Sequence, residues 1–231
     1  MRRRFDPAEP ELMDLPQPVS RELEDDLSSL EWLNRRFGAH RFLGRFLDAQ
    51  FARRRRLRIL DLATGAGDLP RVAAEWGRRR GVAVGVDALD LQPSTLEVAR
   101  ARASAYPEIA FHRHDVREPW RGGGYDLVIS FLALHHFSED DARRVLTAMA
   151  RHAAAARLVV DLERSRAAAI GVHLLTQFVL TAPMTRHDAR VSVRRAFSLP
   201  ELAGLARESG WRISAHRRVF LFRQALSELP A

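Results

Sequence analysis

The stretch that decides the fold runs from Arg58 to Pro70 and reads RILDLATGAGDLP. An apolar run ends at Asp61 and leads through Gly65 and Gly67 into a segment with helical character. A buried strand that passes through a glycine-rich turn into a helix brings backbone N–H groups close to a nucleotide. A dinucleotide-binding turn carries a third glycine three residues after the second, where this chain has Pro70. The stretch therefore predicts a nucleotide-binding α/β domain and argues against NAD as its ligand.

Alternating apolar strands and amphipathic helices follow this stretch, which predicts a mainly parallel sheet with helices on both faces. We expect Ser94 to cap the second helix and Asp68 to cap the first. The expected strands cover residues 57–62, 82–89, 109–112, 125–131 and 158–162, and the expected helices cover 69–80, 94–105 and 140–155.

We expect a single domain over residues 1–231. The segments that flank the nucleotide-binding part differ in composition and in expected secondary structure. Residues 1–52 are expected to form a loose arm (1–20) and a helical lid, and 53–165 the cofactor-binding core. Residues 166–197 are expected to form a helical substrate-cap insert, with an apolar helical half over 167–180 and a polar, arginine-rich half over 181–195. Residues 198–231 are expected to form a last helix, which Ser198 caps, and two strands over 211–217 and 219–226.

Composition excludes several classes of protein. The 231 residues are 46% hydrophobic but contain no apolar run of about 18 residues, so we expect no membrane span. The absence of cysteine excludes disulfides and thiolate chemistry, and with no visible secretory signal it fits a cytoplasmic protein. All 37 basic residues are arginine, and we interpret the net charge of +8 as a codon-driven surface, not a nucleic-acid interface.

Three carboxylates recur at similar intervals, since Asp90 follows Asp61 by 29 residues and Asp115 follows Asp90 by 25. Each interval fits one strand–helix unit, so the three should meet at the carboxyl edge of the sheet, where ligands of open α/β sheets bind. Asp90 is placed to accept the ribose hydroxyls and Asp115 the adenine amino group. Asp61 would attract an ammonium group and repel a pyrophosphate. This set indicates S-adenosylmethionine as the cofactor.

Four segments in order resemble the class I S-adenosylmethionine-dependent methyltransferases, within the small-molecule branch that includes ubiquinone- and menaquinone-biosynthesis enzymes. They are ILDLATGAGD from Ile59, the acid Asp90, the HDV turn from His114, and YDLVISFLALHHF from Tyr125. The resemblance implies a Rossmann-like sheet of seven strands, mostly parallel with the last antiparallel. The cofactor-binding residues it implies, together with those expected from position, are Asp61, Ala63, Thr64, Gly65, Gly67, Asp90, Leu91, Asp115, Val116, Ser130 and Phe131.

The methyl acceptor requires a different set of residues. Two histidines are candidate bases, His136 beside His135 after the fourth strand, and His187 beside Asp188 in the insert. We expect one of the paired histidines to face the pocket and the other to pack away, although the pair could simply anchor the next helix. His187 could equally lie in a solvated loop. An apolar wall is expected from Leu175, Phe178, Val179 and Met184, which could alternatively form a dimer interface, so monomer and homodimer both stay open.

These residues predict transfer of a methyl group to a small hydrophobic acceptor, with O-methylation of a phenolic or polyketide-like molecule of secondary metabolism favoured. C-methylation of a quinone precursor is the alternative. A nucleic-acid methyltransferase lacks support from a suitable catalytic motif, and an NAD-dependent oxidoreductase or a non-catalytic nucleotide-binding protein are alternatives from other classes. No metal site is expected, because no two histidines lie four residues apart on a helix with an acidic partner.

Overall fold

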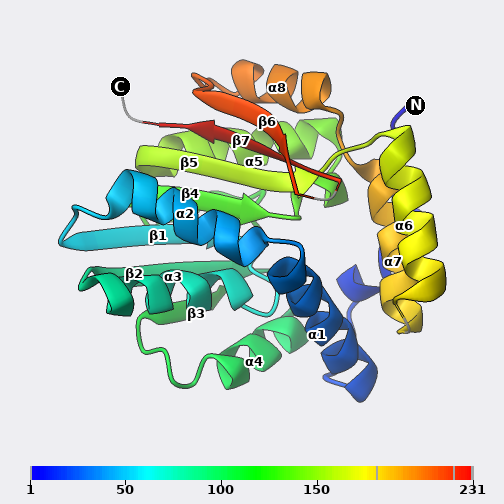
Figure 1. The fold of residues 1–231 in the computed structure, drawn as a ribbon, viewed down its shortest axis with the longest axis horizontal. Coiled ribbons are helices and arrows are strands. Elements are labelled where there is room, and N and C mark those ends of the chain that lie inside the picture. Colours follow the sequence, from blue (N-terminus) through cyan, green and yellow to red (C-terminus); the bar gives the residue numbers. More distant parts are fainter. Residues whose placement is uncertain (1, 181, 221, 230–231) are drawn as a thin grey trace.

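A seven-stranded sheet in the order β3-β2-β1-β4-β5-β7-β6 organises the computed structural model, which describes residues 2–180, 182–220 and 222–229. Strands β1 to β5 are parallel, and β7 runs antiparallel to both β5 and β6 (Figure 1). This is the predicted Rossmann-like sheet of seven strands, so the fold class is confirmed. The strands are β1 Arg56–Leu62, β2 Ala83–Asp90, β3 Ile109–Arg113, β4 Tyr125–Phe131, β5 Ala153–Leu162, β6 Ala215–Val219 and β7 Arg223–Glu228.

Helices cover both faces of the sheet and the end where the parallel strands finish (Figure 1). Helices α2 and α3 pack on one face, and α5 and α8 pack on the other. Helices α1, α6 and α7 lie beyond the carboxyl ends of the strands. The helices are η1 Leu12–Asp14, α1 Arg21–Arg36, α2 Ala39–Phe51, α3 Asp68–Arg80, α4 Pro93–Arg102, η2 Leu134–His136, α5 Glu139–His152, α6 Arg166–Phe178, α7 Pro183–Arg195 and α8 Leu199–Glu208.

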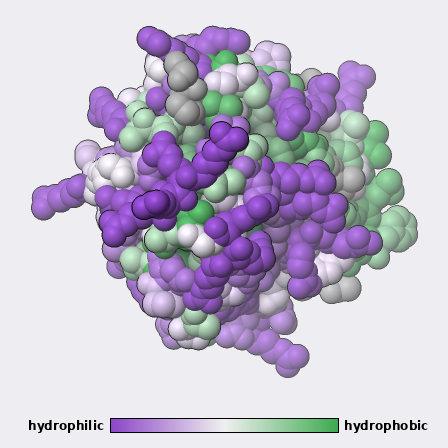
Figure 2. Space-filling view, turned by 60° about the vertical axis from the view of Figure 1, so that its left-hand side comes forward, coloured by the Kyte–Doolittle hydropathy of each residue, from purple (hydrophilic) through white to green (hydrophobic). Residues whose placement is uncertain are grey.

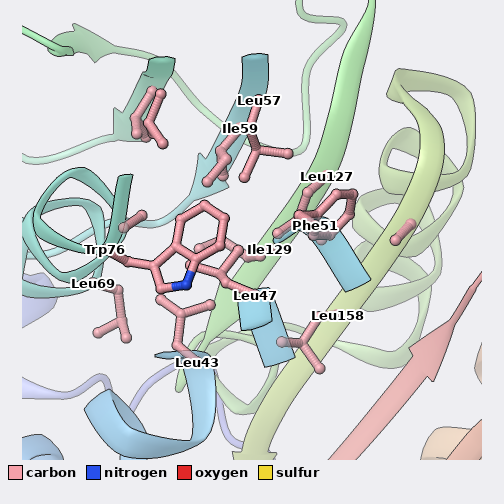
Figure 3. Packing of buried hydrophobic residues seen from close by; sticks show 14 of the residues in the cluster. Leu43, Leu47, Phe51, Leu57, Ile59, Leu69, Trp76, Leu127, Ile129 and Leu158 are labelled. Carbon is pink, nitrogen blue, oxygen red and sulfur yellow. The ribbon is translucent and has the colours of Figure 1, made fainter. Parts of the chain in front are cut away.

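The core on the α2–α3 face gathers around Trp76, whose indole lies among Leu43 and Leu47 of α2 and the apolar side chains of β1 and β4 (Figure 3). The ring nitrogen of Trp76 donates to Asp48 Oδ1 at 2.9 Å, so its one polar atom is satisfied at the edge of the core. This packing buries Leu57 and Ile59 and so anchors β1, the strand that leads into the glycine-rich turn.

Several element boundaries differ from the predicted ones. Helix α4 begins at Pro93 with Gln92 as its N-cap, so Ser94 lies inside the helix and does not cap it. Strand β5 takes Ala153 and the residues after it from the helix predicted over 140–155, because this stretch pairs with β4. The strand predicted over 211–217 is displaced to β6, since Trp211 turns inward and donates to Leu146 O at 2.9 Å.

Two segments are more ordered than expected. Residues 183–195 form α7, with Pro183 in its first turn, which agrees with a helical insert but not with a solvated loop around His187; Thr181 lies outside the described residues. The N-terminal arm is not loose, because Arg195 donates to the carbonyls of Asp6 and Glu9 at 2.6 and 2.7 Å. Both errors have one cause: the arm and α7 order each other through contacts between residues almost 190 positions apart.

The surface reflects the arginine-rich composition. Figure 2 shows a face on which hydrophilic side chains predominate, while apolar side chains gather toward its right-hand edge. Among the described residues, no helix combines the length and the apolar character needed to cross a membrane.

Candidate active site

A cavity of about 410 Å³ lies at the carboxyl ends of β1, β2 and β4, beneath a cover built from η1, α1, α6 and α7. Its walls differ in character. The sheet edge contributes carboxylates and the glycine-rich turn, whereas the cover contributes apolar side chains of α1 and α6. A site with a polar side for one ligand and an apolar side for another suits a reaction between two bound molecules.

The three predicted carboxylates all line this cavity. Asp61 is 2% exposed and accepts from Thr64 Oγ1 at 2.6 Å. Burial raises the pKa of Asp61 to about 8, and the nearby carboxylates of Asp68 and Asp90 add to the rise. Asp61 therefore has a strong preference for either a proton or a bound cation.

The other two carboxylates have fixed positions. Asp90 accepts from the backbone N–H of Gly65 at 2.8 Å and of Gln92 at 3.0 Å, and burial raises its pKa. Asp115 forms an ion pair with Arg117, whose hydrogen bonds lower the pKa of Asp115. Both side chains stand at the cavity wall with their oxygens directed by the backbone or by a neighbouring arginine.

The glycine-rich turn shapes the wall through Gly65, which lines the cavity with a φ of +57° and open space where a Cβ would lie. Gly67 and Ser130 are not among the described lining residues, in contrast to the prediction. A Cβ on Gly67 would approach the Phe111 ring to 2.8 Å, so this glycine permits close packing instead. Ser130 is buried in the sheet and donates to Leu62 O at 3.3 Å. The other predicted cofactor residues line the cavity: Ala63, Thr64, Leu91, Val116 and Phe131.

Three non-glycine residues that line the cavity have left-handed backbone conformations: Ala63 with φ 57°, Leu132 with φ 53° and Phe222 with φ 57°. Such a conformation costs about 1–3 kcal/mol and often occurs at functional sites. Ala63 follows β1 and Leu132 follows β4, so both strands end in a strained residue that faces the same space. The sequence pattern did not single out Leu132, because leucine carries no turn signal.

Both His135 and His136 line the cavity, so the expectation that one packs away is wrong. His135 Nδ1 lies 2.6 Å from Asp161 Oδ1, and the His135 backbone N–H donates to Asp161 Oδ2 at 3.0 Å. His136 Nδ1 lies 2.6 Å from Asp14 Oδ2. Each imidazole is therefore oriented by its own carboxylate through Nδ1, which leaves Nε2 for other partners.

Electrostatics distinguish His136 from an ordinary base. Burial alone lowers the pKa of His136, but the carboxylates of Glu11, Asp14 and Asp161 outweigh burial and raise the pKa to about 10. At neutral pH the ring is an imidazolium, which donates hydrogen bonds but takes up no proton. His136 is therefore better suited to contact a substrate oxygen than to remove its proton.

The structure does not bring His187 into the cavity. His187 lies on α7 with its side chain 42% exposed, in a separate surface hollow beside Glu9 and Arg190. Its Nδ1 is 2.9 Å from Asp188, whose carboxylate also accepts from the backbone N–H groups of Leu12 and Met13. Asp188 thus holds η1 over the cavity.

The apolar wall also differs from the predicted one. Leu175 lines the cavity as expected, but Phe178 is 82% exposed and Val179 also faces solvent. Met184 is buried but is not among the described lining residues. Among the described residues, the apolar side chains of the cover that line the cavity are Met13, Leu27, Leu30, Leu33, Phe37, Val172, Leu175 and Leu180.

Sequence reasoning missed several polar residues at the cavity. Asp68 does not cap α3; it accepts from Asn34 at 3.0 Å and lies 2.7 Å from His40 Nε2. Arg223 is buried and donates to Asn34 Oδ1 at 3.0 Å. The lining residues Glu11, Asp14, Asn34 and Arg223 come from segments far apart in the chain, so no local spacing could have indicated them.

Comparison with known proteins gives one family match and many structural neighbours. Residues 59–155 match a family model described as a methyltransferase domain, and no curated protein sequence matches the chain. A magnesium protoporphyrin IX methyltransferase from Synechocystis PCC 6803, solved with bound S-adenosylhomocysteine, is 16% identical with a TM-score of 0.62, over 95% of this chain and 91% of that chain.

Two further neighbours have similar scores. An O-methyltransferase family protein from Burkholderia thailandensis is 19% identical with a TM-score of 0.63, over 89% of this chain and 59% of that chain. A putative methyltransferase from Haloferax volcanii, solved with the Trm112 activator, is 15% identical with a TM-score of 0.63, over 93% of this chain and 100% of that chain. At these identities the likeness establishes the fold.

Proposed function

We propose that this chain transfers a methyl group from S-adenosylmethionine to a hydroxyl of a small hydrophobic acceptor, phenolic or polyketide-like. The match of residues 59–155 to a methyltransferase domain and the fold shared with solved methyltransferases support this proposal. One observation carries the proposal: the carboxylates Asp61 and Asp90 and the carboxylate-bound imidazole of His135 line one cavity.

The methyl donor is S-adenosylmethionine, and the polar wall offers a group for each part of it. Asp61, which is buried beside other carboxylates, would take the ammonium group in place of a proton. Asp90 would accept from the ribose hydroxyls, and Asp115 from the adenine amino group. A structural neighbour with bound S-adenosylhomocysteine supports this choice of cofactor.

The acceptor would lie against the cover, between the apolar side chains of α1 and those of α6. Leu30 approaches from α1, Phe37 from the residue that caps its C-terminal end, and Leu175 from α6. These side chains favour a flat, apolar molecule. A hydroxyl on that molecule would be the group that reaches the polar wall at His135.

Methyl transfer is an in-line displacement. The acceptor oxygen attacks the methyl carbon, the carbon–sulfur bond breaks, and its electron pair stays on sulfur to give S-adenosylhomocysteine. The acceptor proton moves to His135 Nε2, because Asp161 holds the Nδ1 side of the ring. His136, as an imidazolium, stabilises the charge that develops on the acceptor oxygen.

The test is a transfer assay with methyl-labelled S-adenosylmethionine and a set of hydrophobic phenols, each paired with its own O-methyl ether. We expect label on the phenols and none on the ethers. His135→Ala should lower kcat by about 100-fold or more while the Kd for S-adenosylhomocysteine stays unchanged. His112→Ala is the matched control, since His112 also pairs with a carboxylate (Asp87, 2.8 Å) but lies outside the cavity lining.

Label on the ring carbons of the ethers would instead indicate C-methylation, as in the alternative of a quinone precursor. Transfer to none of the phenols by a protein that binds S-adenosylhomocysteine would contradict the proposed acceptor class.

A further inference from the structure

Glu11, His135 and His136 converge at one point of the cavity wall, although Glu11 is more than 120 residues from the histidines. One ligand atom from each residue lies within 4.8 Å of the other two. Two imidazoles and one carboxylate form a ligand set used by catalytic zinc sites and by non-haem iron sites.

Glu11 is 2% exposed, and its Oε1 has no hydrogen-bond partner among the described residues. The Nε2 atoms of His135 and His136 each lie 3.7 Å from a Glu11 oxygen, which is too long for a hydrogen bond. Two ligand atoms bound at about 2.1 Å to one tetrahedral ion lie about 3.4 Å apart. The spacing therefore fits a shared ion after a small inward movement.

The outer partners of the two histidines also have the arrangement of a metal site. His135 Nδ1 faces Asp161 and His136 Nδ1 faces Asp14, each at 2.6 Å. Metal-binding histidines typically donate their second ring N–H to a carboxylate, which fixes the tautomer and turns the other nitrogen toward the metal. Here both rings have this partner, and both Nε2 atoms face Glu11.

We propose that Glu11, His135 and His136 bind one divalent transition-metal ion, such as Zn²⁺, and that the ion holds the acceptor oxygen. The metal site itself stands on the geometry alone, whereas the role of the ion in holding the acceptor oxygen rests on the proposed function. Three protein ligands leave a tetrahedral ion a fourth position, which the acceptor hydroxyl can reach because all three residues line the cavity.

An oxygen bound to such an ion loses its proton more readily. In the metal-bound protein His135 is then a ligand instead of the base. His136 releases its Nε2 proton to solvent when the ion binds, and the acceptor proton also passes to solvent. The methyl group still moves from sulfur to oxygen, with no change in oxidation state.

The test is titration of the chelator-treated full chain with Co²⁺, which reports its coordination through visible absorption, followed by competition with Zn²⁺. We expect one equivalent to bind, and Mg²⁺ not to compete, because imidazole ligands favour transition metals. Glu11→Gln and His136→Ala should each weaken Co²⁺ binding at least tenfold, and Asp161→Asn about 10-fold to 100-fold. His112→Ala, the matched control outside the cavity, should bind as the wild type does.

Absence of Co²⁺ and Zn²⁺ binding to the wild type overturns the proposal, whatever the variants do. The proposal is also overturned if folded Glu11→Gln binds Co²⁺ as tightly as the wild type does. If Glu11→Gln does not fold, the same comparison is made with folded His136→Ala. A parallel titration with S-adenosylhomocysteine separates the two proposals. Binding of that molecule without metal binding leaves the proposed function standing, and metal binding without it leaves only the metal site.

Discussion

Asp61 illustrates how one buried carboxyl group couples stability to function. Its folded-state pKa of about 8 lies above the unfolded value of 3.8, so the folded protein holds the extra proton between these values. The free energy of unfolding of the ligand-free protein should therefore fall as pH rises from about 4 to about 8.

Asp61→Asn has no carboxyl group to ionise, so it removes the free-energy cost of burying a charged carboxylate at high pH. We expect the variant to melt several degrees higher than the wild type at pH 8, and the difference to shrink toward pH 4. The same change should weaken binding of S-adenosylhomocysteine, because the ammonium group loses its carboxylate. Thermal melts at a series of pH values measure the first effect, and an equal melting temperature for both proteins at pH 8 would contradict it.

Gly67 and Gly204 form a matched pair of glycines for a second prediction. Gly67 has φ +71°, and a Cβ there would meet the Phe111 ring, so Gly67→Ala should cost about 2 kcal/mol or more. Gly204 lies in α8 with open space at its Cβ position, so Gly204→Ala should gain up to about 1 kcal/mol. Urea unfolding of both variants measures the two effects; destabilisation by Gly204→Ala would show that the packing argument is wrong.

The sequence predicted those residues whose positions follow from the local spacing of strands and helices. Asp61 and Asp90 lie at the ends of β1 and β2, and Gly65 and Asp115 come shortly after β1 and β3, so their position at the sheet edge follows from the strand–helix pattern. Gly67 and Ser130 were wrongly expected at the cavity, because spacing cannot tell a residue that faces a ligand from one that packs behind it.

The element that closes the cavity is η1, and its attachment to α7 can be tested through Asp188. The Asp188 carboxylate accepts from Leu12 N at 2.7 Å and from Met13 N at 3.0 Å. Asp188→Ala leaves both donors unpaired, which costs about 1–3 kcal/mol locally. Hydrogen exchange of the Leu12 and Met13 amides should then accelerate at least tenfold.

Asp25→Ala is the control for this experiment, because Asp25 is exposed and its contact with Arg21 is 3.9 Å long. It should leave the exchange of both amides unchanged. Unaltered protection in Asp188→Ala would mean that η1 is held over the cavity by other contacts, such as those of Arg195.

Elements with strong periodicity were predicted well, as for β1, β4 and α3. Helix α7 was missed because several of its polar residues are buried only beneath the N-terminal segment, and η1 was missed because its backbone is held by Asp188 of that distant helix. Arg195 and Asp188 read as surface charges in the sequence, yet both are buried under the N-terminal segment. Such tertiary contacts override the local signal.

For the molecule as a whole, the two halves of the site differ in how far the sequence reveals them. The cofactor half derives from consecutive strand–helix units, which fix its geometry from one stretch of chain. The acceptor half combines η1, α1, η2 and α6, which are brought together only by the fold. The cofactor was therefore predictable, while Glu11 and Asp14 were not.

The central claim, that this chain is an S-adenosylmethionine-dependent methyltransferase, is tested most directly by calorimetric titration with S-adenosylhomocysteine, with NAD in parallel. We expect one site with micromolar Kd and no heat from NAD. Asp90→Ala, checked for folding by its melting curve, should weaken binding at least tenfold, since hydrogen bonds to a charged group contribute about 1.5–3 kcal/mol. Binding of NAD by the wild type would contradict this claim, and so would a wild type that does not bind S-adenosylhomocysteine. An unchanged Kd for S-adenosylhomocysteine in Asp90→Ala would contradict the assigned cofactor site.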